Sequence, residues 1–159
     1  MWPLSSSVMP ANSDRLKEQI RASAAEIGRL HARIHEAFLV RDKGRDEWRE
    51  WEDACREFHS RFDELAFPGG YDGAAERLLS GDVNTIEATL CFLELRPYFF
   101  RSGYMFSSLL RKAKRAPLAG QHAERLAAVL ASYSKWRAEK LASRGHNYSL
   151  KRTDQSLRD

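Results

Sequence analysis

The sequence is poor in the features that mark secreted and membrane proteins. It has two cysteines in 159 residues, Cys55 and Cys91, which are too few and too far apart for a disulfide framework. No segment approaches the roughly 18 uninterrupted apolar residues of a membrane span, and the N-terminus has no basic segment followed by an apolar one. We therefore expect a cytoplasmic protein with free thiols and no membrane contact.

Motifs of common catalytic chemistry are also missing. The chain has no G-x-S-x-G, no phosphate-binding G-x-x-x-x-G-K-[ST], no H-E-x-x-H and no C-x-x-C. Neighbouring carboxylates such as Glu47 and Glu50 lie among arginines, where solvated ion pairs are the ordinary explanation. We expect no enzymatic activity and no cofactor.

Strand-like alternation is absent, and apolar residues instead recur at helical spacings. Residues 13–43 contain such a pattern without a proline, and a heptad pattern follows at Trp48, Trp51, Cys55, Phe58, Phe62 and Leu65. The link at residues 43–45 is short, so the two helices should fold back on each other. The pattern predicts an antiparallel, coiled-coil-like hairpin over residues 13–66.

Breaks after residue 66 divide the rest of the chain into shorter elements. Phe67–Gly73 (FPGGYDG) interrupts the helical pattern, and Asp82 is a good cap for a following helix. Pro97 is favoured as the first residue of a helix running to about Arg115, and a last helix begins near Pro117.

The predicted fold is all-α. We expect one domain over residues 13–142, in which the helical hairpin is followed by three or four shorter packed helices in a helical subdomain over residues 72–142. Residues 1–12 are predicted to be a flexible leader, and residues 143–159 a flexible basic tail.

The stretch LRPYFFRSGY, residues 95–104, concentrates aromatic and basic side chains. In the predicted helix Phe99 faces the core, and Arg96, Tyr98 and Arg101 lie off the stripe of Phe99. We predict that these three residues bind a partner protein.

Charge is divided unevenly along the chain. Residues 1–95 hold 12 Lys and Arg against 18 Asp and Glu, whereas residues 96–159 hold 14 against 4. A basic half can bind phosphates, so an accessory factor for RNA or DNA is an alternative function. The cations that would serve it are Arg111, Lys112, Lys114, Arg115, Lys135, Arg137, Lys140 and Arg144.

A metal site is a second alternative. His31 and His35 are four residues apart on one predicted helix, and Cys55 and His59 are four apart on the next. An antiparallel hairpin would place the two pairs at the same height, and zinc accepts imidazole and thiolate ligands. Cys55 belongs to the apolar seam, however, so packing of its thiol competes with this reading.

Arg115 and His122 are separated by six residues. This spacing resembles the R-x(4-6)-H signature of HEPN-type ribonuclease domains, and such a resemblance implies cleavage of RNA. Pro117 and Gly120 interrupt the motif, and Ala116 replaces the usual polar residue, so the activity is not carried over.

The remaining features favour binding over catalysis. A long helical hairpin with an exposed heptad pattern invites association with another helix, and opposite charge on the two halves would orient that contact. We therefore predict a non-enzymatic protein–protein interaction module of the adaptor, accessory-subunit or immunity and antitoxin kind. Its partner would be another protein or a second copy of itself.

Overall fold

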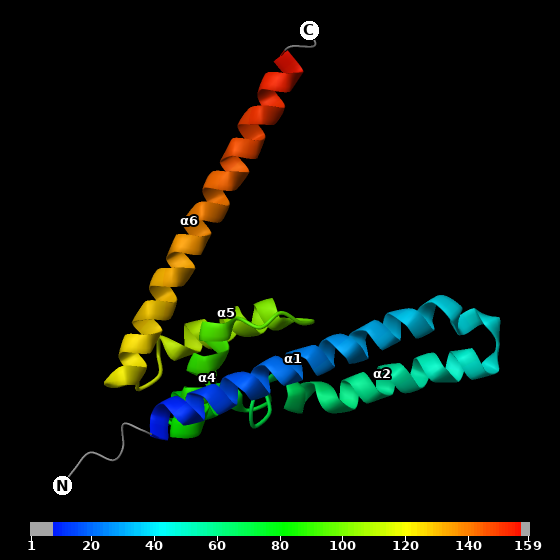
Figure 1. Ribbon diagram of the computed structural model, residues 1–159, viewed down its shortest axis with the longest axis horizontal. Helices are drawn as coiled ribbons and strands as arrows, with labels where there is room; N and C mark the ends of the chain where they lie inside the picture. Colours follow the sequence, from blue (N-terminus) through cyan, green and yellow to red (C-terminus); the bar gives the residue numbers. More distant parts are fainter. Residues whose placement is uncertain (1–7, 157–159) are drawn as a thin grey trace.

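The computed structural model describes the backbone of residues 8–156 and the side chains of residues 12–146. This range contains six α-helices, one short 3-10 helix and no strand, which confirms the all-α fold class. Figure 1 shows a long helical hairpin, a compact group of helices at its open end, and a last helix that leaves the body.

The hairpin consists of α1 (Val8–Val40) and α2 (Arg45–Ala66), joined by a 3-10 helix at Arg41–Lys43. The two helices run antiparallel, as predicted (Figure 1). Helix α1 begins at Val8, so residues 8–12 are helical where a flexible leader was predicted. The remainder of the predicted leader, residues 1–7, lies outside the described residues.

The heptad seam of α2 is only partly closed. Phe58 is buried, Trp48 is 41% exposed, and the other predicted seam residues are half-buried. Near the tip α1 opposes α2, whereas toward the open end Phe99 and Phe100 also contact the seam, with ring centroids 6.2 and 6.4 Å from that of Phe62. Two helices alone cannot bury large side chains completely, so burial increases toward the open end.

Helix α4 (Val83–Leu95) is the centre of the compact group, with α3 (Ala74–Leu79) and α5 (Ser102–Ala113) beside it. All nine residues from Thr85 to Leu93 are buried, as expected for a helix that is surrounded by others. Asp82 caps this helix as predicted, because its Oδ2 accepts a hydrogen bond from the Thr85 amide at 2.9 Å.

The helix predicted to start at Pro97 starts at Ser102 instead. Arg96 closes α4 with φ of 51°, and the chain then forms a loop up to Arg101. In this loop the Phe99 side chain is buried, with its ring centroid 6.3 Å from that of Phe92. Burying Phe99 next to the end of α4 requires the extended turn, so tertiary packing overrides the preference of proline for a first helical turn.

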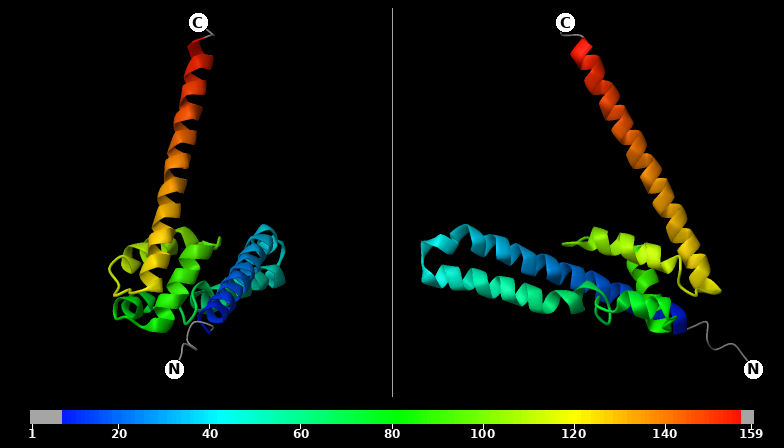
Figure 2. Two further views of the ribbon diagram at one scale, coloured as in Figure 1. Left: turned by 60° about the vertical axis from the view of Figure 1, so that its left-hand side comes forward. Right: turned by 180° about the vertical axis from the view of Figure 1, so that it is seen from behind.

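The last helix, α6 (Gln121–Ser156), is the longest of the described helices and differs from one prediction. It continues through residues 143–156, where a flexible tail was predicted. The flexibility of that segment stays a prediction. Its first turns pack on α4, and it then projects away from the body in every view (Figures 1 and 2). None of the described helices combines the length and apolar character needed to cross a membrane.

Candidate partner-binding site

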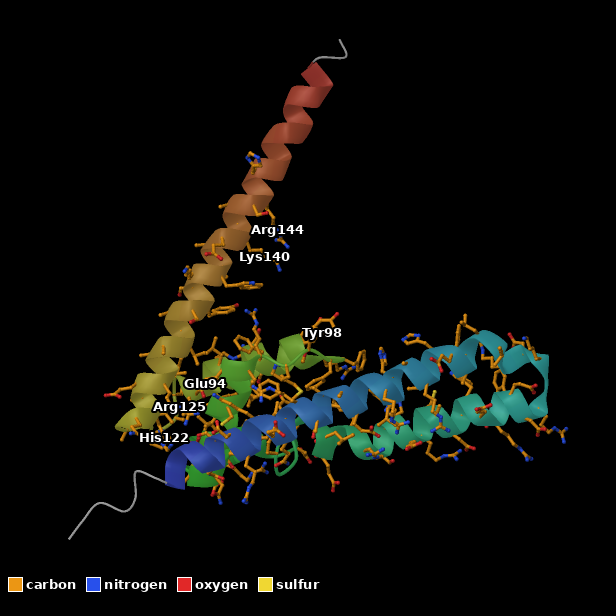
Figure 3. All side chains as sticks on the ribbon, in the orientation of Figure 1. Glu94, Tyr98, His122, Arg125, Lys140 and Arg144 are labelled. Atoms are coloured by element: carbon orange, nitrogen blue, oxygen red, sulfur yellow. The ribbon has the colours of Figure 1, made fainter. Side chains whose placement is uncertain are left out.

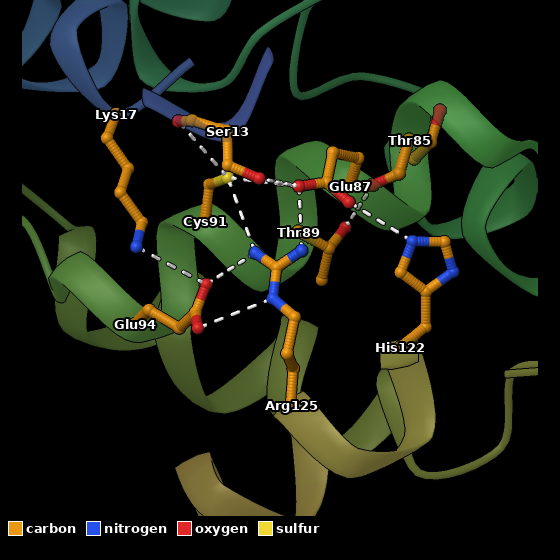
Figure 4. A network of polar contacts seen from close by, with 9 residues as sticks. All are labelled: Ser13, Lys17, Thr85, Glu87, Thr89, Cys91, Glu94, His122 and Arg125. Atoms are coloured by element: carbon orange, nitrogen blue, oxygen red, sulfur yellow. Dashed lines mark hydrogen bonds and ion pairs between the residues drawn. The ribbon is translucent and has the colours of Figure 1, made fainter. Parts of the chain in front are cut away.

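The start of α6 is fixed to α4 by the buried carboxylate of Glu87, whose side chain is 5% exposed. Its Oε1 accepts hydrogen bonds from Arg125 Nη1 at 2.7 Å and from the Ser13 hydroxyl of α1. Its Oε2 lies 3.1 Å from His122 Nε2 (Figure 4). One carboxylate thereby joins α1, α4 and α6.

Arg125 extends this network about two turns along α4, to Glu94. Its Nη2 donates to Glu94 Oε1 at 2.5 Å, and Lys17 Nζ of α1 lies 3.6 Å from the same oxygen. The Cys91 sulfur is 3.6 Å from Arg125 Nη2 (Figure 4). Because Glu87, Cys91 and Glu94 are four and three residues apart, they form one polar strip along an otherwise apolar helix.

Burial and hydrogen bonding shift the pKa values of Glu87, Arg125 and Cys91 in this network. Burial opposes the charge of Glu87, but hydrogen bonds from Ser13 and Arg125 outweigh it and hold the pKa below the ordinary value of 4.5. Burial likewise opposes the charge of Arg125, yet its bonds to Glu94 and Glu87 raise its pKa. Burial raises the pKa of the Cys91 thiol, which removes its nucleophilic character. The cluster therefore joins α1, α4 and α6 through hydrogen bonds and ion pairs.

Arg96 braces α6 about three turns further along. Its guanidinium carbon lies 4.0 Å from the ring centroid of Trp136 on α6 and 4.8 Å from that of Phe106 on α5. The Tyr133 ring is 5.6 Å away, and it helps to line a pocket of about 280 Å³ between α4, α5 and α6. Such cation–π contacts hold the helix at its angle to the body.

The three residues predicted to bind a partner occupy different positions in the loop after α4. Arg96 is exposed and lies over Trp136 in the brace, and its binding to a partner stays a prediction. Tyr98 is 96% exposed and points away from the body (Figure 3). Arg101 is exposed, with its guanidinium carbon 5.3 Å from the Phe100 ring centroid. Tyr98 and Arg101 remain available to a partner.

Beyond Trp136 every described side chain of α6 is exposed. Helical spacing places Arg137, Lys140 and Arg144 on the side of the helix that carries Tyr133. Figure 3 shows Lys140 and Arg144 on the side of α6 that faces the hairpin. We call the face that carries these three cations the inner face of α6.

The cations of the nucleic-acid alternative fall into two groups. Arg111, Lys112, Lys114 and Arg115 lie at the end of α5 and just after it, and the other four lie on α6. Within the described residues none of the eight forms an ion pair, although Lys140 Nζ is 4.7 Å from the Trp136 ring centroid. Lys112 is half-buried and the other seven are exposed. The basic half therefore carries uncompensated charge on its surface.

The predicted metal site is not assembled. In the part of the chain that the structure describes, no three His, Cys, Asp or Glu residues come close enough together to hold an ion. His31 packs against His35 and Phe100, with ring centroids 4.6 and 5.1 Å apart, respectively. Cys55 is half-buried in the seam, and His59 is exposed. Cys55 therefore packs in the hairpin, which was the alternative to a metal site.

His122, half of the motif that resembles a ribonuclease signature, is engaged by Glu87. Arg115 is exposed on the turn before α6, and its side chain forms no hydrogen bond or ion pair within the described residues. The structure therefore gives no further support to that resemblance.

Sequence reasoning missed the residues that orient α6. Glu87, Cys91 and Glu94 interrupt an apolar helix at helical spacing, and His122 and Arg125 are three residues apart. That spacing was a usable signal for a polar strip on a buried helix. It did not reveal the partner of the strip, which lies more than thirty residues away in the chain.

Comparison of this chain with protein-family models, with curated proteins and with solved structures found no match.

Proposed function

We propose that this chain is a non-enzymatic module that binds another protein through the inner face of α6 and the exposed part of the loop after α4. The observation that supports the proposal is the unpacked end of α6. An isolated helix of this length is marginal in water, and packing of one face normally stabilises it. For residues 137–146, the part of α6 beyond Trp136 whose side chains the structure describes, the body supplies no such packing, so a partner is the natural source of it.

The chemistry of the inner face favours an acidic helix as the ligand. Arg137, Lys140 and Arg144 are separated by three and four residues, so they form a row along one side of α6. Acidic residues at the same spacing on a partner helix would lie opposite this row. Exposed Tyr98 and Arg101 would extend the contact at the base of the helix.

Binding of RNA or DNA is the second candidate. The seven exposed cations without ion pairs in the described residues favour it, together with Tyr98 and Tyr104, which are 96% and 83% exposed. Cations follow a phosphate backbone, and exposed aromatic rings stack on bases. This candidate differs from the first in requiring no particular face of α6.

One experiment separates the two candidates. The full chain is titrated against a fluorescent helical peptide with Glu residues at alternating spacings of three and four, and against a single-stranded oligonucleotide of equal charge, at low and high salt. The variant is Lys140→Glu on the inner face. The matched control is Lys135→Glu, because Lys135 is equally exposed and lies on the opposite side of α6.

For a protein-binding module we expect Lys140→Glu to weaken peptide binding at least about tenfold, and Lys135→Glu to weaken it less than about threefold, because only the first charge faces the ligand. Equal effects of the two reversals would contradict docking on the inner face. Tighter binding of the oligonucleotide than of the peptide at high salt would favour the nucleic-acid candidate instead.

A further inference from the structure

We propose that the acidic helix bound by α6 is α2 of a second copy of this chain, so that two copies exchange their last helices in a symmetric dimer. This inference rests on the proposed function and names its partner. A dimer with a two-fold axis would contain the contact between α6 and α2 twice.

Helix α2 carries the acidic face that the inner face of α6 requires. It has eight acidic and four basic residues. Asp46, Glu50 and Asp53 are four and three residues apart, so they share one side of the helix. All three are exposed, and within the described residues only Asp53 has an ion pair, with Arg56 at 3.0 Å.

The row of exposed acidic residues on α2 ends before Glu57, which contacts α1 of the same hairpin. Glu57, one turn beyond Asp53, is engaged by Arg33 of α1 and lies 3.4 Å from Arg61. The free acidic positions are therefore those nearer the tip of the hairpin. Arg49 and Arg56 flank them, which limits the favourable contact to a narrow row.

The spacings of the two rows match when the helices run antiparallel. From Arg137 the cations follow at three and then four residues, and from Asp53 toward Asp46 the carboxylates follow at three and then four. This alignment pairs Arg137 with Asp53, Lys140 with Glu50, and Arg144 with Asp46. At about 1.5 Å per residue each step is the same length on both helices.

This register defines the extent of the contact. Residues 134–145 of α6 lie opposite residues 45–56 of α2, over a rise of about 17 Å. The row of α6 cannot reach α2 of its own chain, because α1 lies between them in Figure 1 and in the right-hand view of Figure 2. Only another molecule brings the two rows together.

The contact is electrostatic and exposed, so it will be sensitive to salt. Individual surface ion pairs contribute little, and screening weakens them further. We expect a dissociation constant of about micromolar order at low salt that rises at least tenfold at high salt. Sedimentation of the full chain over a range of concentrations measures both values.

Charge exchange provides the decisive test. One variant carries Lys140→Glu with Arg144→Glu, and a second carries Asp46→Lys with Glu50→Lys. Each variant alone would face like charge, so we expect its dimer to weaken at least about tenfold. The heterodimer that forms in an equimolar mixture regains both contacts, because the reversed α6 meets the reversed α2 and the native α6 meets the native α2. We expect a heterodimer within about threefold of the native affinity, and Lys135→Glu leaves the native dimer intact.

Carbodiimide cross-linking supplies a measurement that needs no substitution. In a mixture of isotope-labelled and unlabelled native chains, we expect an intermolecular bond between Lys140 and Glu50. A native chain that stays monomeric, a dimer unchanged by the reversals, or a mixture that does not associate would each overturn the dimer. A monomer whose inner face still binds the acidic peptide would leave the proposed function standing.

Discussion

Glu87 on α4 and Arg125 on α6 form an ion pair, 2.7 Å between Oε1 and Nη1, that joins the body of the protein to the base of its projecting helix. Leu126 and Val129 of α6 are buried, but apolar contacts are non-directional and so do little to set the orientation of α6. The ion pair between Glu87 and Arg125 is directional, because its hydrogen bond requires a particular orientation of the guanidinium group. Glu94 contacts the other terminal nitrogen of the same guanidinium group. We infer that this pair determines the angle at which α6 leaves α4.

Removal of the charge on Glu87 should destabilise the protein. Glu87→Gln keeps the shape of the side chain but removes the charged acceptor for Arg125 and Ser13. We expect the free energy of unfolding to fall by about 1–3 kcal/mol, measured by urea denaturation. Glu124→Gln is the control, because Glu124 is exposed on α6, next to Arg125 in the chain. Equal stability of the two variants would show that the pair contributes nothing.

Acid should weaken the fold through carboxylates that are paired in the native state. Hydrogen bonds from Arg29 and Arg61 lower the pKa of Glu26 to about 2, and Glu87 also has a lowered pKa. A lowered native pKa contributes stability above the unfolded value, near 4.5, and this contribution is lost as the pH falls toward the native pKa. At about pH 6 to 7 both carboxyls are ionised in the folded and the unfolded chain, so we expect a constant urea midpoint there. Below about pH 4.5 we expect the urea midpoint to fall.

The variant Glu87→Gln provides the control for this pH dependence. It lacks one of the two carboxyls, so its midpoint should fall less steeply with acid than that of the native chain. A native chain whose stability rises on acidification would contradict the assignment of these carboxylates as ionised and paired.

Loss of the brace at Arg96 should loosen α6 without unfolding the body. Arg96→Met removes the cation that lies over Trp136 and Phe106, at a cost of about 1 kcal/mol. We expect faster amide hydrogen exchange in α6 near Trp136 and unchanged exchange in α4. Arg111→Met, at an exposed position of α5, should change neither. Identical exchange in both variants would remove the structural role assigned to Arg96.

The turn between α3 and α4 requires glycine. Gly81 has φ of 87°, and a Cβ there would lie 3.1 Å from Pro117 Cγ. Gly81→Ala should destabilise the protein by about 1–2 kcal/mol, because L-residues are strained in the left-handed region. Gly103→Ala on α5 has open space around the added carbon and should be neutral or slightly stabilising. Thermal unfolding of the two variants compares them directly.

Local pattern accounts for the parts of the fold that were predicted well. The spacing around Phe58 located α2 and its packed face, and Asp82 marked the start of α4 correctly. These signals act over a few residues, because a helix face repeats every three or four positions and a cap bonds three positions ahead.

The errors occur where distant residues decide the conformation. Pro97 favoured a helix, but burial of Phe99 against Phe92 kept residues 96–101 in a loop. Arg96 had no visible structural role in the sequence, because its partner Trp136 is forty positions away. The cations of the candidate site were predicted, because the sequence shows that the second half is basic. Their arrangement as a row on one face of α6 was not predicted.

The sequence by itself determined an all-α chain with a helical hairpin, an acidic first half and a basic second half, because periodicity and charge are properties of the chain. The tertiary structure alone decided that Glu87 accepts a hydrogen bond from Arg125, and that α6 projects away from the hairpin. The physical reason is that helix formation depends on neighbours in sequence. The direction of a helix depends on contacts that only the folded chain brings together.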